Sequence, residues 1–168
     1  MPLPIAVSDT TVLIYLHHLD LLYALSLFYR QILVPAPVRK QFLSRDDDRS
    51  RDTALNILTT SGLFSPCDDY DSIEVDLYKS HKMDEGEAEA LSQLKQRSAD
   101  VLLIDEKRGR SIAQREMRMV QGTASILAKL YKQGFVDYWS AINRLRSEVD
   151  MRIGDDTAHA AFDNEMNS

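Results

Sequence analysis

The segment Val101-Leu102-Leu103-Ile104-Asp105 decides the fold class, because it places four consecutive apolar residues directly before an acid. An uninterrupted apolar run is typical of a strand that is buried on both faces of a parallel sheet. The segment Ile5-Ala6-Val7-Ser8-Asp9 shows a similar arrangement, and its polar end favours the start of a helix. We therefore expect two buried strands, each followed by an aspartate near its carboxyl end.

Three further β-prone runs lie at residues 32–34, 63–66 and 117–120. Segments with helical periodicity separate the strands, and the clearest of them covers residues 84–97. Strands that alternate with helices predict an α/β domain around a mainly parallel sheet. A length of 168 residues suits one domain, so we expect residues 1–168 to form a single domain.

The composition excludes several classes of protein. With 44% hydrophobic and 27% charged residues, the chain is neither disordered nor collagen-like. Its apolar runs fall far short of the roughly 20 residues of a bilayer span, so we expect no membrane association. The N-terminus has no basic segment typical of a signal peptide, and the single Cys67 permits no internal disulfide, which favours a cytoplasmic location. At a net charge of −6, binding to nucleic acid requires a local basic patch or a bound cation.

Asp9 and Asp105 are the first candidates for a functional site. Ligands of open α/β sheets bind beyond the carboxyl ends of the strands, where neighbouring connections leave on opposite faces. If the two strands before these acids are adjacent at that point, both carboxylates reach one crevice. The alternative is that each aspartate only caps the helix that follows it.

Glu87 is the third candidate, because its helical position is unusual for an acid. It is spaced four and seven residues from Leu91 and Leu94, which places it on the apolar side of a helix. Glu85 and Glu89 fall on a different stripe, which also holds Ser92, Gln93 and Gln96 and which we expect to be solvated. A core-facing carboxylate needs a partner or a cation, or else it only interacts favourably with the helix dipole.

Three carboxylates with no histidine or cysteine in the pattern suit an oxygen-preferring cation such as Mg²⁺ or Mn²⁺. Such an ion activates water and orients a phosphodiester. Lys107, Arg108 and Arg110 follow Asp105 closely and are candidates for contacts with RNA phosphates. The alternative for each of these basic residues is a place on a solvated helix face.

Five segments together resemble the PIN-domain nucleases, particularly the group related to VapC toxins. In order along the chain they are residues 7–14, 34–38, 84–90, 102–110 and 121–123. The resemblance implies a Rossmann-like three-layer α/β/α sandwich, with a nuclease-like core over about residues 3–135 and a helical extension over about 136–168. It also implies a metal-dependent endoribonuclease, with metal-site roles for Asp9, Glu87 and Asp105 and a supporting polar role for Thr123.

One position departs from that family. The family usually has an acid in the helical turn after the second strand, where this chain has Val38-Arg39-Lys40-Gln41. Gln41 can accept a hydrogen bond but carries no negative charge, so a module that has lost catalysis and acts in binding or regulation is an alternative function. A haloacid-dehalogenase-type phosphatase is another alternative, although that class requires a second aspartate where this chain has Thr11.

The expected partners follow from these interpretations. An RNase of this group acts on RNA and pairs with an antitoxin protein. Four residues of a late helix, Tyr138, Trp139, Ile142 and Leu145, crowd more apolar surface than a small domain easily buries. We expect this surface to form a homodimer interface, with packing inside the chain as the alternative.

Overall fold

The computed structural model describes residues 1–44, 48–116 and 118–168 of the chain. The chain divides into two compact units, Met1–Gln121 and Gly122–Ser168. Within the described residues, none of the helices combines the length and the apolar character that a membrane span requires. The expectation that residues 1–168 form a single domain stays a prediction.

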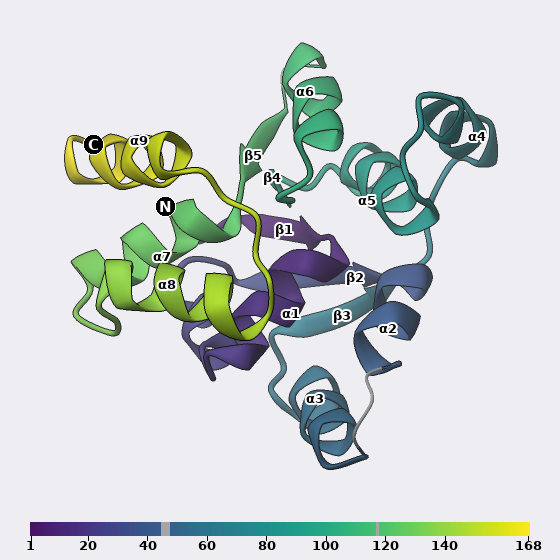
Figure 1. The fold of residues 1–168 in the computed structure, drawn as a ribbon. Coiled ribbons are helices and arrows are strands. Elements are labelled where there is room, and N and C mark those ends of the chain that lie inside the picture. The colour runs from purple at the N-terminus through teal and green to yellow at the C-terminus, as the bar shows by residue number, and fades with distance from the viewer. Residues whose placement is uncertain (45–47, 117) are drawn as a thin grey trace. The chain divides into compact units, whose positions relative to one another are not determined.

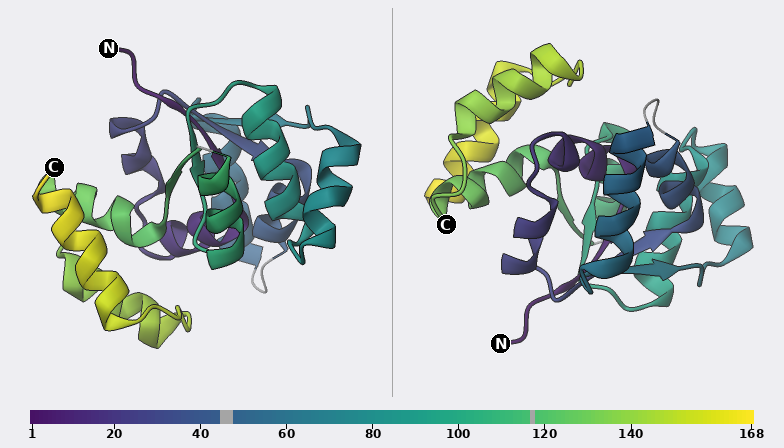
Figure 2. Two further views of the ribbon diagram at one scale, coloured as in Figure 1. Left: turned by 90° about the horizontal axis from the view of Figure 1, so that it is seen from above. Right: turned by 90° about the horizontal axis from the view of Figure 1, so that it is seen from below.

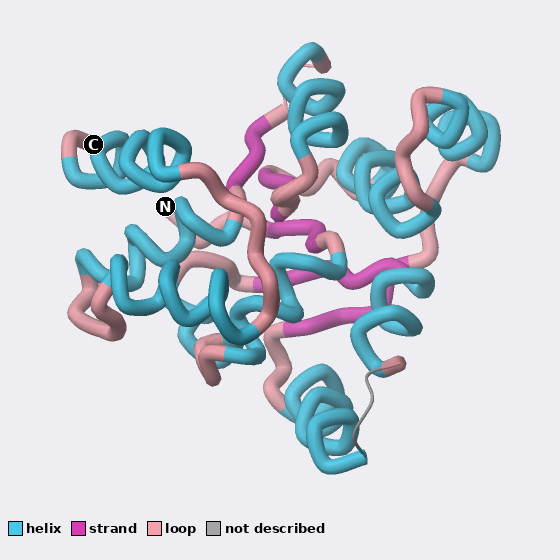
Figure 3. Tube along the Cα trace, in the orientation of Figure 1, coloured by secondary structure: helices cyan, strands magenta, loops and turns pink. Residues whose placement is uncertain are grey.

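The first unit is built on a five-stranded sheet (Figures 1 and 3). Its strands, β1 to β5, are Ile5–Ser8, Gln31–Pro35, Phe64–Cys67, Val101–Leu103 and Met119–Gln121. They lie in the order β3-β2-β1-β4-β5, and every pair of neighbours is parallel. The predicted α/β class with a mainly parallel sheet is therefore confirmed.

Helices flank this sheet. The helical elements of the first unit, in chain order, are α1 (Thr10–His18), the 3₁₀ helix η1 (Leu22–Leu27), α2 (Ala36–Leu43), α3 (Asp48–Thr60), α4 (Ser72–Ser80), α5 (Glu85–Gln96) and α6 (Lys107–Arg115). Parallel strands are joined by right-handed crossovers, and the chain reverses its direction across the sheet between β3 and β4. The helices before and after that reversal therefore lie on opposite faces.

Helix α5 provides most of the cover for one face. It packs against β1, β2 and β4, while α4 and α6 lie beside it (Figure 1). Val7, Leu33 and Leu102 of the sheet and Leu91 and Leu94 of α5 belong to one buried apolar cluster. The apolar side predicted for this helix is thus the side that packs on the sheet.

The second unit contains three helices, α7 (Thr123–Lys132), α8 (Tyr138–Glu148) and α9 (Asp155–Met166), and α7 packs against both of the others (Figure 2). Tyr138, Ile142 and Leu145 are fully buried. The hydroxyl of Tyr138 donates to the backbone oxygen of Ala158 at 2.6 Å, and its ring lies 5.0 Å from that of Phe162. The alternative of packing inside the chain therefore accounts for these three residues, and the homodimer stays a prediction.

Candidate active site

The ends of β1 and β4 meet at the point where the connections of the sheet change direction. The two strands are paired with Ser8 opposite Leu103, and the backbone N–H of Asp9 donates to the oxygen of Leu103 at 2.9 Å. The condition set for Asp9 and Asp105, that their strands are adjacent, is therefore met. In doubly wound sheets this is the place where ligands bind.

Asp9 is buried, with 3% of its surface exposed. It occupies the N-cap position of α1, but its side chain makes no capping hydrogen bond, so helix capping does not explain it. Burial, together with the neighbouring charges of Glu87, Asp84 and Asp105, raises its pKa to about 8, although the backbone hydrogen bond of Thr10 acts to lower it. These acids therefore share one electrostatic environment.

Glu87 has two features, of which the sequence analysis predicted the first. It is 7% exposed on the packed side of α5, and it is also part of a capping box at the start of that helix. Its Oε2 accepts from the backbone N–H of Asp84 at 3.0 Å, while Asp84 Oδ1 accepts from the N–H of Glu87 at 2.8 Å. Burial, followed by the charges of Asp84 and Glu106, raises the pKa of Glu87 to about 6.

Asp84 was not among the predicted site residues, although it lies beside both Glu87 and Asp9. The signal was present, because an N-cap acid followed three residues later by glutamate is the capping-box pattern. The glycine at position 86, two residues after Asp84, is explained by the packing around it. A Cβ there would lie 3.3 Å from Val38 and 3.5 Å from Gln41 Oε1, so glycine lets α2 approach the start of α5.

Gln41 lies at this site, which the sequence left open. Its Oε1 accepts a hydrogen bond of 2.6 Å from the hydroxyl of Thr10, the residue next to Asp9. The position that is usually acidic in the resembling family therefore holds a neutral oxygen acceptor here. Its bond to Thr10 holds Gln41 close to the acids.

The stripe of α5 that we expected to be solvated is largely buried, so that prediction is wrong for three of its residues. Glu89 is 5% exposed, and Ser92 and Gln93 are 0% exposed. The reason is α4, which packs against α5 and was not predicted as a helix. Burial, then the charges of Glu85 and Asp68, raises the pKa of the Glu89 carboxyl.

The predicted RNA-contact residues lie in the first turn of α6, directly after Asp105. Lys107 and Arg108 are exposed and Arg110 is partly exposed. Arg108 donates from Nη1 to the backbone oxygen of Lys82 at 3.2 Å, and its charge lowers the pKa of Glu87. Arg108 therefore interacts electrostatically with one of the acids of the site. All three remain predictions as RNA contacts.

Thr123, the predicted supporting residue, is the first residue of α7 in the second unit, and its side chain is buried. Its supporting role stays a prediction.

The acids of the first unit fit an oxygen-preferring cation in chemistry, since they are carboxylates and one is buried without a capping bond. Their side chains are not arranged around one point as the ligands of a metal ion are. Among the residues that the structure describes, no three Asp, Glu, His or Cys side chains lie together closely enough to hold a metal ion. The assignment of Asp9, Glu87 and Asp105 as metal ligands therefore remains a prediction.

Taken together, a doubly wound parallel sheet with acids at its switch point defines the class of α/β proteins that bind ligands beyond their strand ends. Within that class, the chain belongs to the PIN domain family, which matches residues 5–165. PIN domains are generally nucleases and typically bind Mg²⁺ or Mn²⁺. A comparison with curated proteins found no match.

Proposed function

We propose that this PIN domain is a Mg²⁺- or Mn²⁺-dependent endoribonuclease of the cytoplasm and the toxin of a toxin–antitoxin pair related to the VapC group. The observation that carries the proposal is the buried Asp9 carboxylate, which is not used as a helix cap and lies beside Asp84, Glu87 and Asp105. Burying Asp9 and Glu87 beside two further acids without a function is unfavourable, because each charge raises the cost of ionising the others.

In this proposal Asp9, Glu87 and Asp105 hold the ion. The ion supplies an activated water and stabilises charge on the leaving oxygen. The role of the three carboxylates is to fix its position at the ends of β1 and β4. Asp84 keeps Glu87 oriented through the capping box, and Thr10 does the same for Gln41.

The basic residues of α6 have the complementary task. An acidic crevice repels the phosphates of RNA, so the substrate needs cationic contacts at its edge. Arg108 is placed for this role, since it is exposed and its charge acts on Glu87. Lys107 and Arg110, from the same helix, extend the contact along the backbone of the substrate.

The test is cleavage of a mixed RNA pool under titrated Mn²⁺ by the wild type, Asp9→Asn and Asp76→Asn. Asp76 is an exposed acid of α4 and serves as the matched control for loss of one carboxylate. We expect Mn²⁺-dependent cleavage by the wild type and by Asp76→Asn, and none by Asp9→Asn. Equal cleavage by all three proteins would show that the nuclease is a contaminant and that the proposal is wrong.

A second candidate function is a catalytically weakened PIN domain that acts in binding or regulation. It is favoured by one observation, the neutral Gln41 that is bonded to Thr10 beside the acids. A protein of this kind binds RNA or Mn²⁺ without cleaving, so binding measured alongside cleavage distinguishes the two functions. The phosphatase alternative is the weaker one, because Thr11 stands where it requires an aspartate.

A further inference from the structure

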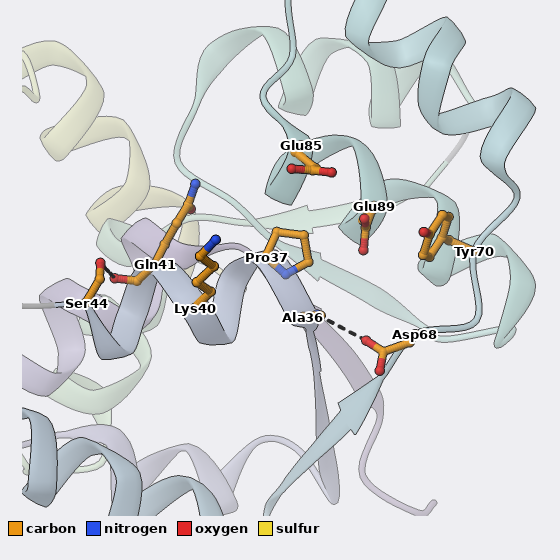
Figure 4. Close-up of a pocket in the computed structure, with 9 residues that line it drawn as sticks. All are labelled: Ala36, Pro37, Lys40, Gln41, Ser44, Asp68, Tyr70, Glu85 and Glu89. Atoms are coloured by element: carbon orange, nitrogen blue, oxygen red, sulfur yellow. Dashed lines mark hydrogen bonds between the residues drawn. The ribbon is translucent and has the colours of Figure 1, made fainter.

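A groove lies between α2 and the first half of α5, and Gln41, which is bonded to Thr10 beside Asp9, is one of its lining residues. It encloses about 590 Å³ and carries three acids, Asp68, Glu85 and Glu89, against one base, Lys40 (Figure 4). Its charge is therefore negative. Tyr70, 43% exposed, provides an aromatic surface at one end of the groove.

Glu89 is the residue of this groove that most needs a partner. It is 5% exposed, and within the described part of the chain its Oε2 is buried with no hydrogen-bond partner. In Figure 4 its carboxylate points from α5 into the space between Pro37 and Tyr70. A buried carboxylate oxygen without a donor is costly, so the site is built for a donor that comes from outside these residues.

Gln93 is a second buried polar residue of α5. It lies one helical turn after Glu89 on the same stripe of α5 and is 0% exposed. Both of its amide atoms are without a hydrogen-bond partner among the described residues. Gln93 does not line the groove, so it is the unpartnered oxygen of Glu89 that indicates a ligand there.

The basic side chains that the structure describes around the groove do not provide a hydrogen-bond donor for Glu89. Arg39 pairs with Asp68 at 3.3 Å, and Figure 4 draws Asp68 on the far side of the groove from Glu85. Lys40 makes no ion pair within residues 1–44, 48–116 and 118–168. The charges of Lys79 and Arg39 act on Glu89 only from a distance, since neither residue forms a salt bridge with it in the described structure.

We propose that this groove binds a guanidinium group, with Glu89 and Glu85 as its carboxylate partners and Tyr70 as the surface on which it stacks. A guanidinium carries five donors in a plane, so one group serves several acceptor oxygens at once. It is more weakly hydrated than an ammonium ion and stacks on aromatic rings, which suits a half-buried site beside Tyr70. This binding does not depend on the proposed nuclease activity.

A bare metal ion is a poorer occupant. The acids of the groove do not form a cluster of three close ligands in the part of the chain that the structure describes. A planar cation with donors on several edges bridges acids that are spaced apart, whereas Mg²⁺ requires ligands in near-ideal octahedral positions around one point.

The test is an NMR titration of the full ¹⁵N-labelled chain with acetyl-arginine amide in the presence of a chelator. The matched probe is acetyl-citrulline amide, which has the same shape without the charge. We expect arginine amide, and not the citrulline compound, to shift the backbone amides of residues 36–44 and 85–93. Equal shifts with both compounds, or no shifts with either, overturn the inference.

Variants locate the site. We expect Glu89→Gln and the exposed Glu85→Gln each to weaken binding about tenfold, since each removes a charge-assisted hydrogen bond. Glu85→Gln keeps the test valid if the buried substitution impairs folding. Lys40→Met should strengthen binding, because it removes a competing cation that lines the groove, and Asp76→Asn should leave it unchanged. Binding that is unaffected in Glu85→Gln and Glu89→Gln refutes the assignment.

Asp9→Asn separates this inference from the proposed function. We expect it to abolish RNA cleavage and to leave arginine binding intact. Loss of arginine binding in Asp9→Asn would place the cation in the acidic crevice and overturn the inference, whatever the nuclease assay shows. Binding of agmatine and of the peptide Gly-Gly-Arg-Gly-Gly is then compared to identify the kind of molecule that carries the guanidinium. Tighter binding of the peptide indicates a protein partner, and tighter binding of agmatine indicates a free metabolite, and either outcome supports the guanidinium chemistry.

Discussion

Replacing Asp9 by asparagine should stabilise the folded protein at neutral pH, although it removes the residue on which the proposed activity depends. The pKa of Asp9 is about 8 in the folded chain and 3.8 ordinarily, and burial is the largest cause. The folded state therefore binds this proton more tightly than the unfolded state does. As the pH rises from about 4 towards 8, stability falls, and at pH 7 the loss is roughly 4 kcal/mol.

Asparagine has nearly the same shape and no ionisation, so Asp9→Asn should recover much of this loss. For a chain of 168 residues, a change of 1 kcal/mol corresponds to about 2–4 °C in Tm, which gives an increase on the order of 10 °C at pH 7. The assay is thermal unfolding between pH 6 and 9 in buffer with a chelator. The Tm of the wild type should decrease across this range more steeply than that of the variant.

Two further measurements make the reasoning refutable. Asp76→Asn, which removes an exposed acid, should change Tm little, because exposed charges contribute little to stability. Mn²⁺ should raise the Tm of the wild type more than that of Asp9→Asn, because only the wild type offers the carboxylate. A Tm of Asp9→Asn equal to or below that of the wild type at pH 8 would show that Asp9 is already stabilised in its charged form.

Three other substitutions have definite expected outcomes. Gly109→Ala should lower the urea midpoint of unfolding by the equivalent of about 1–3 kcal/mol, because its Cβ would lie 2.5 Å from Ile104 Cδ1, and an unchanged midpoint would contradict this. Tyr138→Phe should lower stability by about 1–2 kcal/mol in thermal unfolding, because it removes the buried hydrogen bond from the Tyr138 hydroxyl to the oxygen of Ala158, and equal Tm values would show that this bond contributes nothing to stability. Gln41→Glu should lower the Mn²⁺ concentration needed for RNA cleavage, and an unchanged Mn²⁺ titration would exclude Gln41 from the metal site.

The architecture of the first unit could be predicted because its signals are local. Short apolar runs at residues 5–7, 32–34 and 101–104 mark strands, and each coincides with a strand of the sheet. The acids after the first and last of these runs lie at the switch point because β1 and β4 are adjacent, which the sequence analysis stated only as a condition. Asp9 and Asp105 therefore lie where the sequence analysis looked for them, and their role as metal ligands stays a prediction.

The environment of α5 could not be predicted in the same way. The periodicity of that helix identifies the side that packs on the sheet, but not the second side covered by α4. Helix α4 begins at Ser72, with Asp71 as its N-cap, and Ser92 of α5 hydrogen-bonds to both Asp71 and Glu74. Helix α4, which directly precedes α5, and the more distant α2 both pack against α5, and the periodicity of α5 alone contains no record of these neighbours.

The capping box at the start of α5 makes that helix end sensitive to what occupies the crevice. Glu87 uses Oε2 to hold the backbone of Asp84. A ligand that binds only Oε1 leaves the hydrogen bond between Asp84 N–H and Glu87 Oε2 in place. A ligand that binds both oxygens breaks this bond and exposes the N–H of Asp84 to solvent. The rate of amide hydrogen exchange at Asp84 therefore indicates whether a bound ligand contacts one or both carboxylate oxygens of Glu87.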